Sequence, residues 1–426
     1  MNLSISSITE FNFYYDIRFW LVFLLLVVIF RSLSFNFRLR DTFLLIINFL
    51  MLLALPRFDL FSLLFLFSVS SLVFLIGYLL NSGSIIQTKS RKITVAVAGI
   101  SSVILILAFF KYTFIQNIFF TSLAGKGAWA GVADYVFIIG ISYSSFKMMH
   151  FIAESYKQKI TQLNYLNFLN YIFFFTAFIS GPINRYNHFL EQLDFKKDNG
   201  LKNDLALGIE RVIHGFFKKF VLCTIVYPYA LVNMSGSVTE FSLYKILLGL
   251  YAYTFYFYFD FSGYSDIAIG SARIMGIELP ENFNNPFMKK NIQQLWASWH
   301  MSLTRWLTDY IYWPLSRKLR NINYLRRRPV FLSNISIIVT FIICGMWHGE
   351  TLNFAVWGFY HGIGLATLNI YQKHKRKTKN KFMRRYFLSQ YSQFVGIVVT
   401  FHFFVFGLLL FSLKLDEIIN LFMVTF

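Results

Sequence analysis

Two histidines in this chain follow tryptophans, in the segments Trp299-His300 and Gly345-Met346-Trp347-His348-Gly349. Histidine exchanges a proton near neutral pH, so either imidazole could act as a general base towards a hydroxyl group. His348 lies between two apolar runs, residues 330–344 and 352–370, which predicts that it sits at the tip of a helical hairpin. An ionisable side chain at membrane depth indicates a functional site, because burying it there is costly. The alternative is a structural histidine that binds a neighbouring backbone group.

These segments belong to a chain that is too apolar for a soluble protein of 426 residues, with 56% hydrophobic and only 14% charged residues. Several apolar runs approach the roughly 20 residues that a helix needs to cross a bilayer. No polar stretch is long enough to fold alone, so residues 1–426 are expected to form one all-helical, multi-pass membrane domain. Cys223 and Cys344 both lie in apolar segments and indicate neither a disulfide framework nor a metal site.

The net charge is +20, from 40 basic and 20 acidic residues. The basic residues fall in loops between apolar runs, so the positive-inside rule explains them and no nucleic-acid partner is expected. The basic clusters in residues 317–328 and 373–385 flank the hairpin of His348 and should be cytoplasmic. From Arg328 to His348 the chain covers about 30 Å of helix. His348 is therefore expected in the outer half of the membrane or beyond.

A second internal site is indicated around residues 166–179, an apolar run with basic residues on both flanks. Such a run enters and leaves by the same membrane face, and Gly181-Pro182 supplies the break that a re-entrant segment needs. Broken backbone is tolerated at that depth only where it is buried in protein or lines a cavity. Arg185, just after the break, is a candidate for binding a donor phosphate, with a cytoplasmic anchor as the equal alternative. The remaining runs predict about ten spans besides this segment.

Two further stretches are informative although neither predicts a span. Asp260 and Asp266 stand in an aromatic, glycine-broken stretch, where they could bind substrate, orient a helix or pair with Arg273. Residues 296–315 are too polar to cross the membrane and too aromatic to be solvated, and their apolar side chains recur at helical spacing. They are expected to form a helix lying in the membrane interface. His361 is expected to be a packed helix histidine.

Five segments of the sequence occur together in a recognisable order. They are Ser180-Gly181-Pro182-Ile183-Asn184-Arg185-Tyr186, Phe259-Asp260-Phe261-Ser262-Gly263-Tyr264-Ser265-Asp266, Pro280-Glu281-Asn282-Phe283-Asn284-Asn285-Pro286-Phe287, Trp299-His300-Met301-Ser302-Leu303 and Trp347-His348-Gly349. From about residue 140 to 411 the chain resembles the membrane-bound O-acyltransferase (MBOAT) family in its bacterial cell-envelope branch. That branch holds the D-alanyl transfer proteins of teichoic-acid tailoring and the alginate and peptidoglycan O-acetylation proteins.

The resemblance implies a ring of about ten or eleven tilted transmembrane helices, with re-entrant and interfacial helices, around a central tunnel. It implies that His348 is the catalytic histidine, acting as general base, and that His300 is a second essential residue on the cytoplasmic approach. The candidate substrate contacts are Trp347, Trp299, Arg185, Asp260 and Asp266.

The implied reaction moves an activated acyl group across the bacterial cytoplasmic membrane onto hydroxyls of an extracytoplasmic cell-envelope polymer. The acyl group would be D-alanyl or acetyl. The donor would be an acyl-carrier-protein thioester or acetyl-CoA rather than a bound cofactor, and the acceptor side could include an extracytoplasmic partner protein. The sequence has no Gly-x-Ser-x-Gly nucleophile, which favours direct transfer over a serine acyl-enzyme.

Two other functions stay open. A carrier or flippase without chemistry would also have broken helices and buried polar residues, and a structural subunit of an envelope complex would need neither histidine. The chain also departs from the family pattern. Ser298 and Thr308 stand where arginines are usual, and Ser316-Arg317 replaces Gly-Gly. These departures put a specific contact to a donor phosphate near His300 in doubt.

Overall fold

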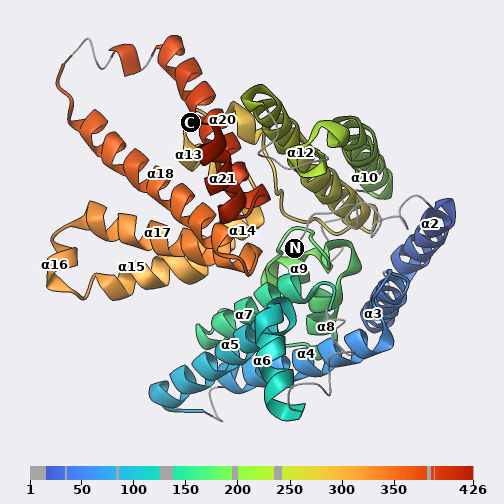
Figure 1. Ribbon diagram of the computed structural model, residues 1–426. Helices are drawn as coiled ribbons and strands as arrows, with labels where there is room; N and C mark the ends of the chain where they lie inside the picture. The colour runs from blue at the N-terminus through green and yellow to red at the C-terminus, as the bar shows by residue number, and fades with distance from the viewer. Residues whose placement is uncertain are drawn as a thin grey trace. The chain divides into compact units, whose positions relative to one another are not determined.

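The computed structural model describes residues 16–33, 36–82, 86–124, 138–193, 200–234, 242–380, 385–387 and 389–425. Within these ranges the chain is helical and has no strand, which confirms the predicted all-helical class (Figure 1). Helix contacts group the chain into two compact units. The N-terminal unit contains Asn2–His214 and Ser265–Pro280, and the C-terminal unit contains Gly215–Tyr264 and Glu281–Phe426. Lys196, Lys197, Lys381 and Arg384, which contributed to the predicted orientation, lie outside the described residues.

In the N-terminal unit, polar residues begin the first apolar helices. The side chains of Asp16, Asn36 and Asp59 each accept a backbone N–H of the first turn that follows, as helix N-caps do. Helices α4, α5 and α7 pack on one another, and α8 packs on α3. The helices of this unit are α2 (Ile17–Ser32), α3 (Phe37–Leu53), α4 (Leu60–Asn81), α5 (Lys89–Lys111), α6 (Thr113–Ala124), α7 (Ile141–Tyr156), α8 (Tyr165–Phe173) and α9 (Tyr186–Leu193).

The predicted re-entrant segment is a short helix that stops early. Helix α8 ends at Phe173, and only one further turn, Phe175–Ala177, precedes α9. The buried Lys147 of α7 donates from Nζ to the carbonyls of Tyr171 (3.0 Å) and Ile172 (3.3 Å). These contacts replace the intrahelical partners that the last carbonyls of a helix lack. The chain is thus broken here, several residues before Gly181-Pro182, and entry and exit by one membrane face stays a prediction.

The C-terminal unit holds the long hairpin and the helices around it. Two helices, α10 and α12, have residues in both units. The helices are α10 (Leu201–Phe216), α11 (Cys223–Val226), α12 (Leu243–Ile274), α13 (Ile292–Trp296), α14 (Met301–Leu307), α15 (Trp313–Leu319), α16 (Asn323–Arg326), α17 (Pro329–His348), α18 (Leu352–Lys377), α20 (Gln390–Ser412) and α21 (Leu415–Thr425).

The prediction of a glycine-broken stretch at residues 260–266 is wrong, because helix α12 runs through these residues without interruption. A Cβ at Gly263 would lie 2.9 Å from the carbonyl oxygen of Gly215 and from the backbone nitrogen of Lys219. The glycine therefore lets two helices of the C-terminal unit touch at their backbones, and it does not break its own helix.

The prediction of a single interfacial helix at residues 296–315 is also wrong. Helix α13 ends at Trp296 and α14 begins at Met301, with His300 between them in the left-handed region at φ 42°. A π-helical turn, Thr308–Tyr312, then separates α14 from α15. The side chains of Trp296, Trp299 and Trp306 are buried among protein, whereas Trp313 stays exposed. Burial in the C-terminal unit, more than position in a membrane interface, accounts for this aromatic pattern.

The hairpin with His348 at its tip forms as predicted. Helix α17 ends at His348 and α18 begins at Leu352 (Figure 1). Its arms approach closely, since a Cβ at Gly358 would lie 2.8 Å from the carbonyl carbon of Phe341 and one at Gly362 2.9 Å from the Cα of Ile338. Small residues allow such close packing between membrane helices.

Among the described residues, four helices are long and apolar enough to cross a membrane by length and composition. They are α4, α5, α17 and α20. The chain therefore has the helices of a multi-pass membrane protein in each of its two units. The count of about ten spans, the single domain and the tunnel stay predictions.

Candidate active site

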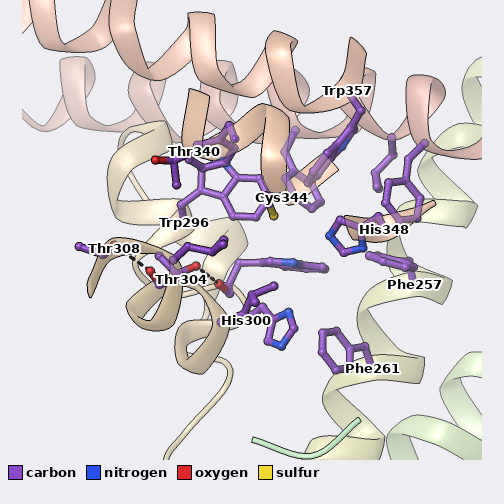
Figure 2. Close-up of a pocket in the computed structure, with 17 residues that line it drawn as sticks. Phe257, Phe261, Trp296, His300, Thr304, Thr308, Thr340, Cys344, His348 and Trp357 are labelled. Carbon is purple, nitrogen blue, oxygen red and sulfur yellow. Dashed lines mark hydrogen bonds between the residues drawn. The ribbon is translucent and has the colours of Figure 1, made fainter. Parts of the chain in front are cut away.

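The C-terminal unit encloses a small cavity that has both candidate catalytic histidines in its wall. His300 comes from the turn between α13 and α14, and His348 from the end of α17 (Figure 2). The cavity has a volume of about 70 Å³. Its lining comprises Phe257, Phe261, Trp296, Trp299, His300, Leu303, Thr304, Leu307, Thr308, Thr340, Phe341, Cys344, His348, Trp357, Phe404, Leu408 and Phe411. Two imidazoles that are far apart in the chain thus face one small space.

Aromatic rings hold the imidazole of His348 at the hairpin tip. Its ring centroid lies 4.7 Å from that of Trp347, 5.2 Å from that of Trp357 and 5.1 Å from that of Phe411. The last two rings meet it edge to face, the arrangement that aromatic quadrupoles favour. Trp357 and Phe411 line the cavity, whereas Trp347 does not. The predicted substrate contact Trp347 therefore lies against the imidazole rather than in the cavity wall.

The two glycines around His348, Gly345 and Gly349, pack against helix α18. A Cβ at Gly349 would lie 2.8 Å from the Cζ of Phe354, and one at Gly345 would lie 3.0 Å from the carbonyl carbon of the same residue. Neither glycine lines the cavity. Their backbone is approached by α18, so the glycines allow the hairpin to close and thereby position His348.

His300 is held in a backbone conformation that side chains other than glycine adopt infrequently, with φ 42° and ψ 54°. Its side chain is 5% exposed, and the ring of Phe261 meets it edge to face at 4.7 Å. Burial lowers the pKa of the His300 imidazole from 6.5 to about 3. The ring is therefore neutral at pH 7, with one N–H donor and one nitrogen acceptor.

A buried asparagine fixes this turn. Asn282 is fully buried, and its backbone carbonyl accepts the N–H of Met301 at 2.9 Å. Its side-chain Oδ1 accepts the backbone N–H of Ser302 at 3.3 Å and the Ser302 hydroxyl at 2.6 Å. A second backbone bond joins the N–H of Asn284 to the carbonyl of Ser298 at 3.0 Å. The loop that contains Asn282 and Asn284 thus binds the chain on both sides of His300.

Trp299 lies beside His300 and lines the cavity. Its ring stacks on Phe257 with centroids 5.8 Å apart and contacts Phe404 at 4.7 Å. Because both partners also line the cavity, Trp299 forms part of its wall. Contact with a substrate stays a prediction.

Three hydroxyl groups of the cavity wall were missed by the sequence reasoning. Thr304 donates to the carbonyl of Trp299 at 3.3 Å and Thr308 to that of Thr304 at 2.7 Å (Figure 2). Thr340 donates to the carbonyl of Ser336 at 2.7 Å. Residues 304 and 308 follow His300 at intervals of four, the spacing of one helix face. That spacing was the available signal, and it went unused because the stretch was interpreted as an interfacial helix.

The remaining candidate contacts lie outside the cavity wall. Asp260 forms an ion pair with the buried Lys219 in the C-terminal unit. Asp266, in the N-terminal unit, pairs with Arg211 at 2.6 Å and not with Arg273, the partner suggested by the sequence.

Arg273 itself pairs with Asp204 at 2.7 Å and with Glu278. Arg185 also lies in the N-terminal unit, and its backbone N–H donates to the side chain of Asn184 at 2.8 Å. In the described part of the chain no group of three or more His, Cys, Asp or Glu side chains could hold a metal ion. Substrate binding by Asp260, Asp266 and Arg185 stays a prediction.

The histidines and their supporting loop lie within the part of the chain that a protein-family model covers. Residues 57–413 match MBOAT, the membrane-bound O-acyltransferase family. The chain belongs to this family. The match extends well before residue 140, where the resemblance of the motifs began.

Curated relatives of this MBOAT protein are named for D-alanyl transfer to teichoic acid or for O-acetylation of alginate or peptidoglycan. Teichoic acid D-alanyltransferase of Bacillus subtilis (strain 168) is 34% identical over 284 residues, which cover 66% of this chain and 70% of that protein. A probable alginate O-acetylase, AlgI of Azotobacter vinelandii, is 30% identical over 66% of this chain and 54% of its own length. Peptidoglycan O-acetyltransferase of Helicobacter pylori (strain 26695) is 28% identical over 68% of this chain and 58% of its own length.

The family assignment decides between the kinds of protein left open by the sequence. The MBOAT protein is a membrane-bound O-acyltransferase, an enzyme that transfers an acyl group to a hydroxyl acceptor. The family assignment therefore favours an enzyme over a carrier, a flippase or a purely structural subunit.

Proposed function

We propose that this enzyme transfers a short acyl group, D-alanyl or acetyl, from a cytoplasmic thioester donor to hydroxyls of an extracytoplasmic cell-envelope polymer. The donor is an acyl-carrier protein or acetyl-CoA, and the enzyme resides in the bacterial cytoplasmic membrane. The observation that carries the proposal is that His300 and His348 line one enclosed cavity with mainly aromatic and aliphatic walls. The basic clusters of residues 317–328 and 373–385 support a cytoplasmic donor side.

The size of the cavity supports a short acyl group. A water molecule needs about 10–15 Å³ of such space, so about 70 Å³ accommodates only a few non-hydrogen atoms. No carboxylate lines the cavity among the described residues. An acetyl group would therefore meet no charged partner, and the ammonium of a D-alanyl group would face aromatic rings such as Trp299 and Trp357, which attract cations. Both acyl groups stay candidates.

The proposed chemistry uses one histidine as base and the other as hydrogen-bond donor. His348 takes the proton of the acceptor hydroxyl while the hydroxyl oxygen attacks the thioester carbonyl carbon. The C–O bond forms, the C–S bond breaks, and the protonated His348 returns the proton to the leaving thiolate. The neutral ring of His300 can donate its N–H to the carbonyl oxygen, where negative charge develops. The product is an ester and a free thiol, so atoms and charge balance.

The proposal is tested by covalent transfer of a radiolabelled acyl group to acceptor polymer in proteoliposomes. His348→Ala should lower the rate by about 10²–10⁴-fold, the usual loss when a general base is removed. His402 provides a matched control, because it is a histidine of the same unit whose ring binds the carbonyl of Val398 at 2.7 Å and does not line the cavity. His402→Ala should leave the rate within about twofold of wild type. Similar rates for the two variants would remove His348 from the chemistry.

A further inference from the structure

The C-terminal unit has a second cleft, which is polar where the histidine cavity is apolar. Its volume is about 360 Å³, and it is lined by Asn291, Gln293, Gln294, Gln372, Lys375 and Arg376. Gln372, Lys375 and Arg376 share one face of α18, and the other three residues lie at the start of α13. Gln372 Nε2 donates to Gln293 Oε1 at 3.3 Å and so joins the two walls. The cleft thus lies between two packed helices.

The amide groups of the cleft have their oxygen atoms engaged more than their NH₂ groups. Asn291 Oδ1 accepts the backbone N–H of Gln294 at 2.9 Å, and Gln294 Oε1 accepts that of Lys290 at 3.3 Å. Gln293 Oε1 accepts from Gln372. Among the described residues, three side-chain NH₂ groups of the α13 wall therefore remain as donors, and Gln372 Oε1 remains as an acceptor.

Two cations add to these donors. No carboxylate lines the cleft, and no ion pair within the described ranges includes Lys375 or Arg376. Lys375 Nζ lies instead 4.7 Å from the centroid of the Phe387 ring. Positive charge and several donors fit the oxygens of a phosphate, and the one remaining acceptor, on Gln372, fits a hydroxyl group beside that phosphate.

The cleft lies next to the beginning of a helix that can cross a membrane. Helix α20 is one of the four candidate spans and begins at Gln390. A Cβ at Gly396, in the second turn of α20, would lie 2.5 Å from the carbonyl oxygen of Lys290. Lys290 directly precedes Asn291, so the start of α13 packs against the first turns of this span. The cleft is therefore close to the level at which α20 enters the bilayer.

Exposed tyrosines mark the same level. Tyr371, Tyr386 and Tyr391 are 48%, 39% and 66% exposed. The rings of Tyr371 and Tyr386 lie 6.0 and 5.9 Å from that of Phe387, the ring that Lys375 contacts. Tyrosine is enriched at the headgroup level of a bilayer, because its ring is apolar and its hydroxyl is polar. The phosphates that surround a protein at this level belong to lipids, and basic pockets between membrane helices bind anionic headgroups there.

We propose that this cleft binds the headgroup of an anionic phospholipid that has free hydroxyls, such as phosphatidylglycerol. Lys375, Arg376 and the NH₂ groups of the α13 wall bind the phosphate, and Gln372 accepts from a headgroup hydroxyl. A choline headgroup has no hydroxyl and brings a positive charge towards both cations, so phosphatidylcholine should bind poorly. The lipid is a ligand of the enzyme and not a substrate, and this inference does not depend on the identity of the acyl donor.

Helix α13 connects the cleft to the histidine cavity. Asn291 caps one end of the helix, and Trp296, at the other end, lines the cavity. The ring of Trp296 lies 5.7 Å from that of Trp357, which in turn lies 5.2 Å from the imidazole of His348. A headgroup that joins the start of α13 to α18 stabilises the helices that carry both tryptophans. Acyl transfer should therefore be faster when the lipid is bound.

The alternative is that Lys375 and Arg376 only enforce orientation or attract anionic membranes as a whole. Their neighbours Lys373 and Lys377 supply a matched control, since they carry the same charge on the same turns of α18 but do not line the cleft. Orientation and long-range attraction depend on total charge, so both pairs should matter equally to them. Binding of a headgroup in the cleft should depend only on the pair that lines it.

The binding experiment compares wild type, Lys375→Gln/Arg376→Gln and Lys373→Gln/Lys377→Gln as full chains in detergent micelles. Dioctanoyl phosphatidylglycerol is titrated, with dioctanoyl phosphatidylcholine as the reference lipid, and the unfolding midpoint is measured at each concentration. A ligand that binds only the native state raises this midpoint, and the concentration dependence gives an apparent Kd. The cleft variant should bind phosphatidylglycerol about tenfold more weakly than wild type, whereas the control variant should stay within about twofold.

The activity experiment uses the same three proteins in nanodiscs of phosphatidylcholine with a rising share of phosphatidylglycerol. Label transfer should rise by about fivefold in wild type and in the control variant and stay constant in the cleft variant. An equal rise in all three proteins would reflect total charge and overturn the inference, as would equal apparent Kd values for the two variants. Soluble glycerol phosphate that raises the midpoint as strongly as the lipid would also overturn it, because the cleft would then be a site for small phosphates. Phosphatidylglycerol binding without label transfer in any of the proteins would support the cleft and contradict the proposed function.

Discussion

The turn that carries His300 depends on the side chain of Asn282, which gives a prediction with a worked magnitude. Asn282→Ala removes two accepted hydrogen bonds, from the N–H and the hydroxyl of Ser302 at 3.3 and 2.6 Å. A neutral hydrogen bond contributes about 0.5–1.5 kcal/mol, and a buried donor left unsatisfied costs about 1–3 kcal/mol. The free energy of unfolding should therefore fall by roughly 2–4 kcal/mol. Displacement of the turn by about 1 Å should also cost up to about 10²-fold in rate.

Unfolding can be followed with a thiol-reactive dye, because Cys223 and Cys344 are both buried and become reactive only when the protein opens. The matched control is Asn284→Ala. Asn284 is exposed, and its hydrogen bond to the carbonyl of Ser298 uses its backbone N–H, which the substitution keeps. We expect an unfolding midpoint and a transfer rate near wild type for Asn284→Ala and lower values of both for Asn282→Ala.

A double-mutant cycle identifies the lost interaction. Ser302→Ala removes only the hydroxyl bond, so alone it should destabilise less than Asn282→Ala. Added to Asn282→Ala it should cost nothing further, because the hydroxyl bond to Asn282 is already absent. Equal unfolding midpoints and transfer rates for Asn282→Ala and Asn284→Ala would refute the reasoning that the asparagine holds the catalytic turn.

Three further predictions concern the hairpin, pH and the basic loops. Gly358→Ala should destabilise the protein by about 1–3 kcal/mol, as overpacking does, and should lower the transfer rate. The reason is that its Cβ would lie 2.8 Å from the carbonyl carbon of Phe341. An unchanged unfolding midpoint in the thiol-dye assay would contradict the close packing. Burial lowers the pKa of His300 from 6.5 to about 3, so between these values the unfolded state binds more protons and stability falls as pH falls below 6.5. The unfolding midpoint of His300→Gln should therefore depend less on pH between 7.5 and about 5 than that of wild type. An equal pH dependence in the two proteins would argue against a buried neutral ring. Neutralising residues 326–328 should keep the orientation but weaken the apparent affinity for donor, most at low salt, where charges are least screened; a correctly oriented variant with wild-type donor dependence would leave those charges with topology alone.

The hairpin and its histidine could be predicted from the sequence because the signals are local. Long apolar runs, bounded by basic clusters, define α17 and α18 by length and charge alone. The all-helical class follows in the same way from composition. Such features need no knowledge of which residues meet in space.

The errors arose where a contact distant in the sequence decides the local structure. Gly263 was interpreted as a helix break, but whether a glycine ends a helix or admits a neighbour depends on what packs against it, here Lys219. The helical spacing of the tryptophans continued through His300, and it gave no sign that Asn282, far from it in the chain, would hold a left-handed turn there. Thr304 and Thr308 were missed for the same reason, since their spacing from His300 was attributed to the single interfacial helix expected at residues 296–315.

The contact of Lys147 with the end of α8 has a consequence for how the protein is made. An ammonium inside a membrane protein is costly unless polar groups surround it. The carbonyls that accept its hydrogen bonds belong to Tyr171 and Ile172, 24 and 25 residues later in the chain. Helix α7 leaves the ribosome before them, so Lys147 gains these hydrogen bonds only after α8 has been synthesised and has folded back. The two helices should therefore reach their final structure together, as one step of biogenesis.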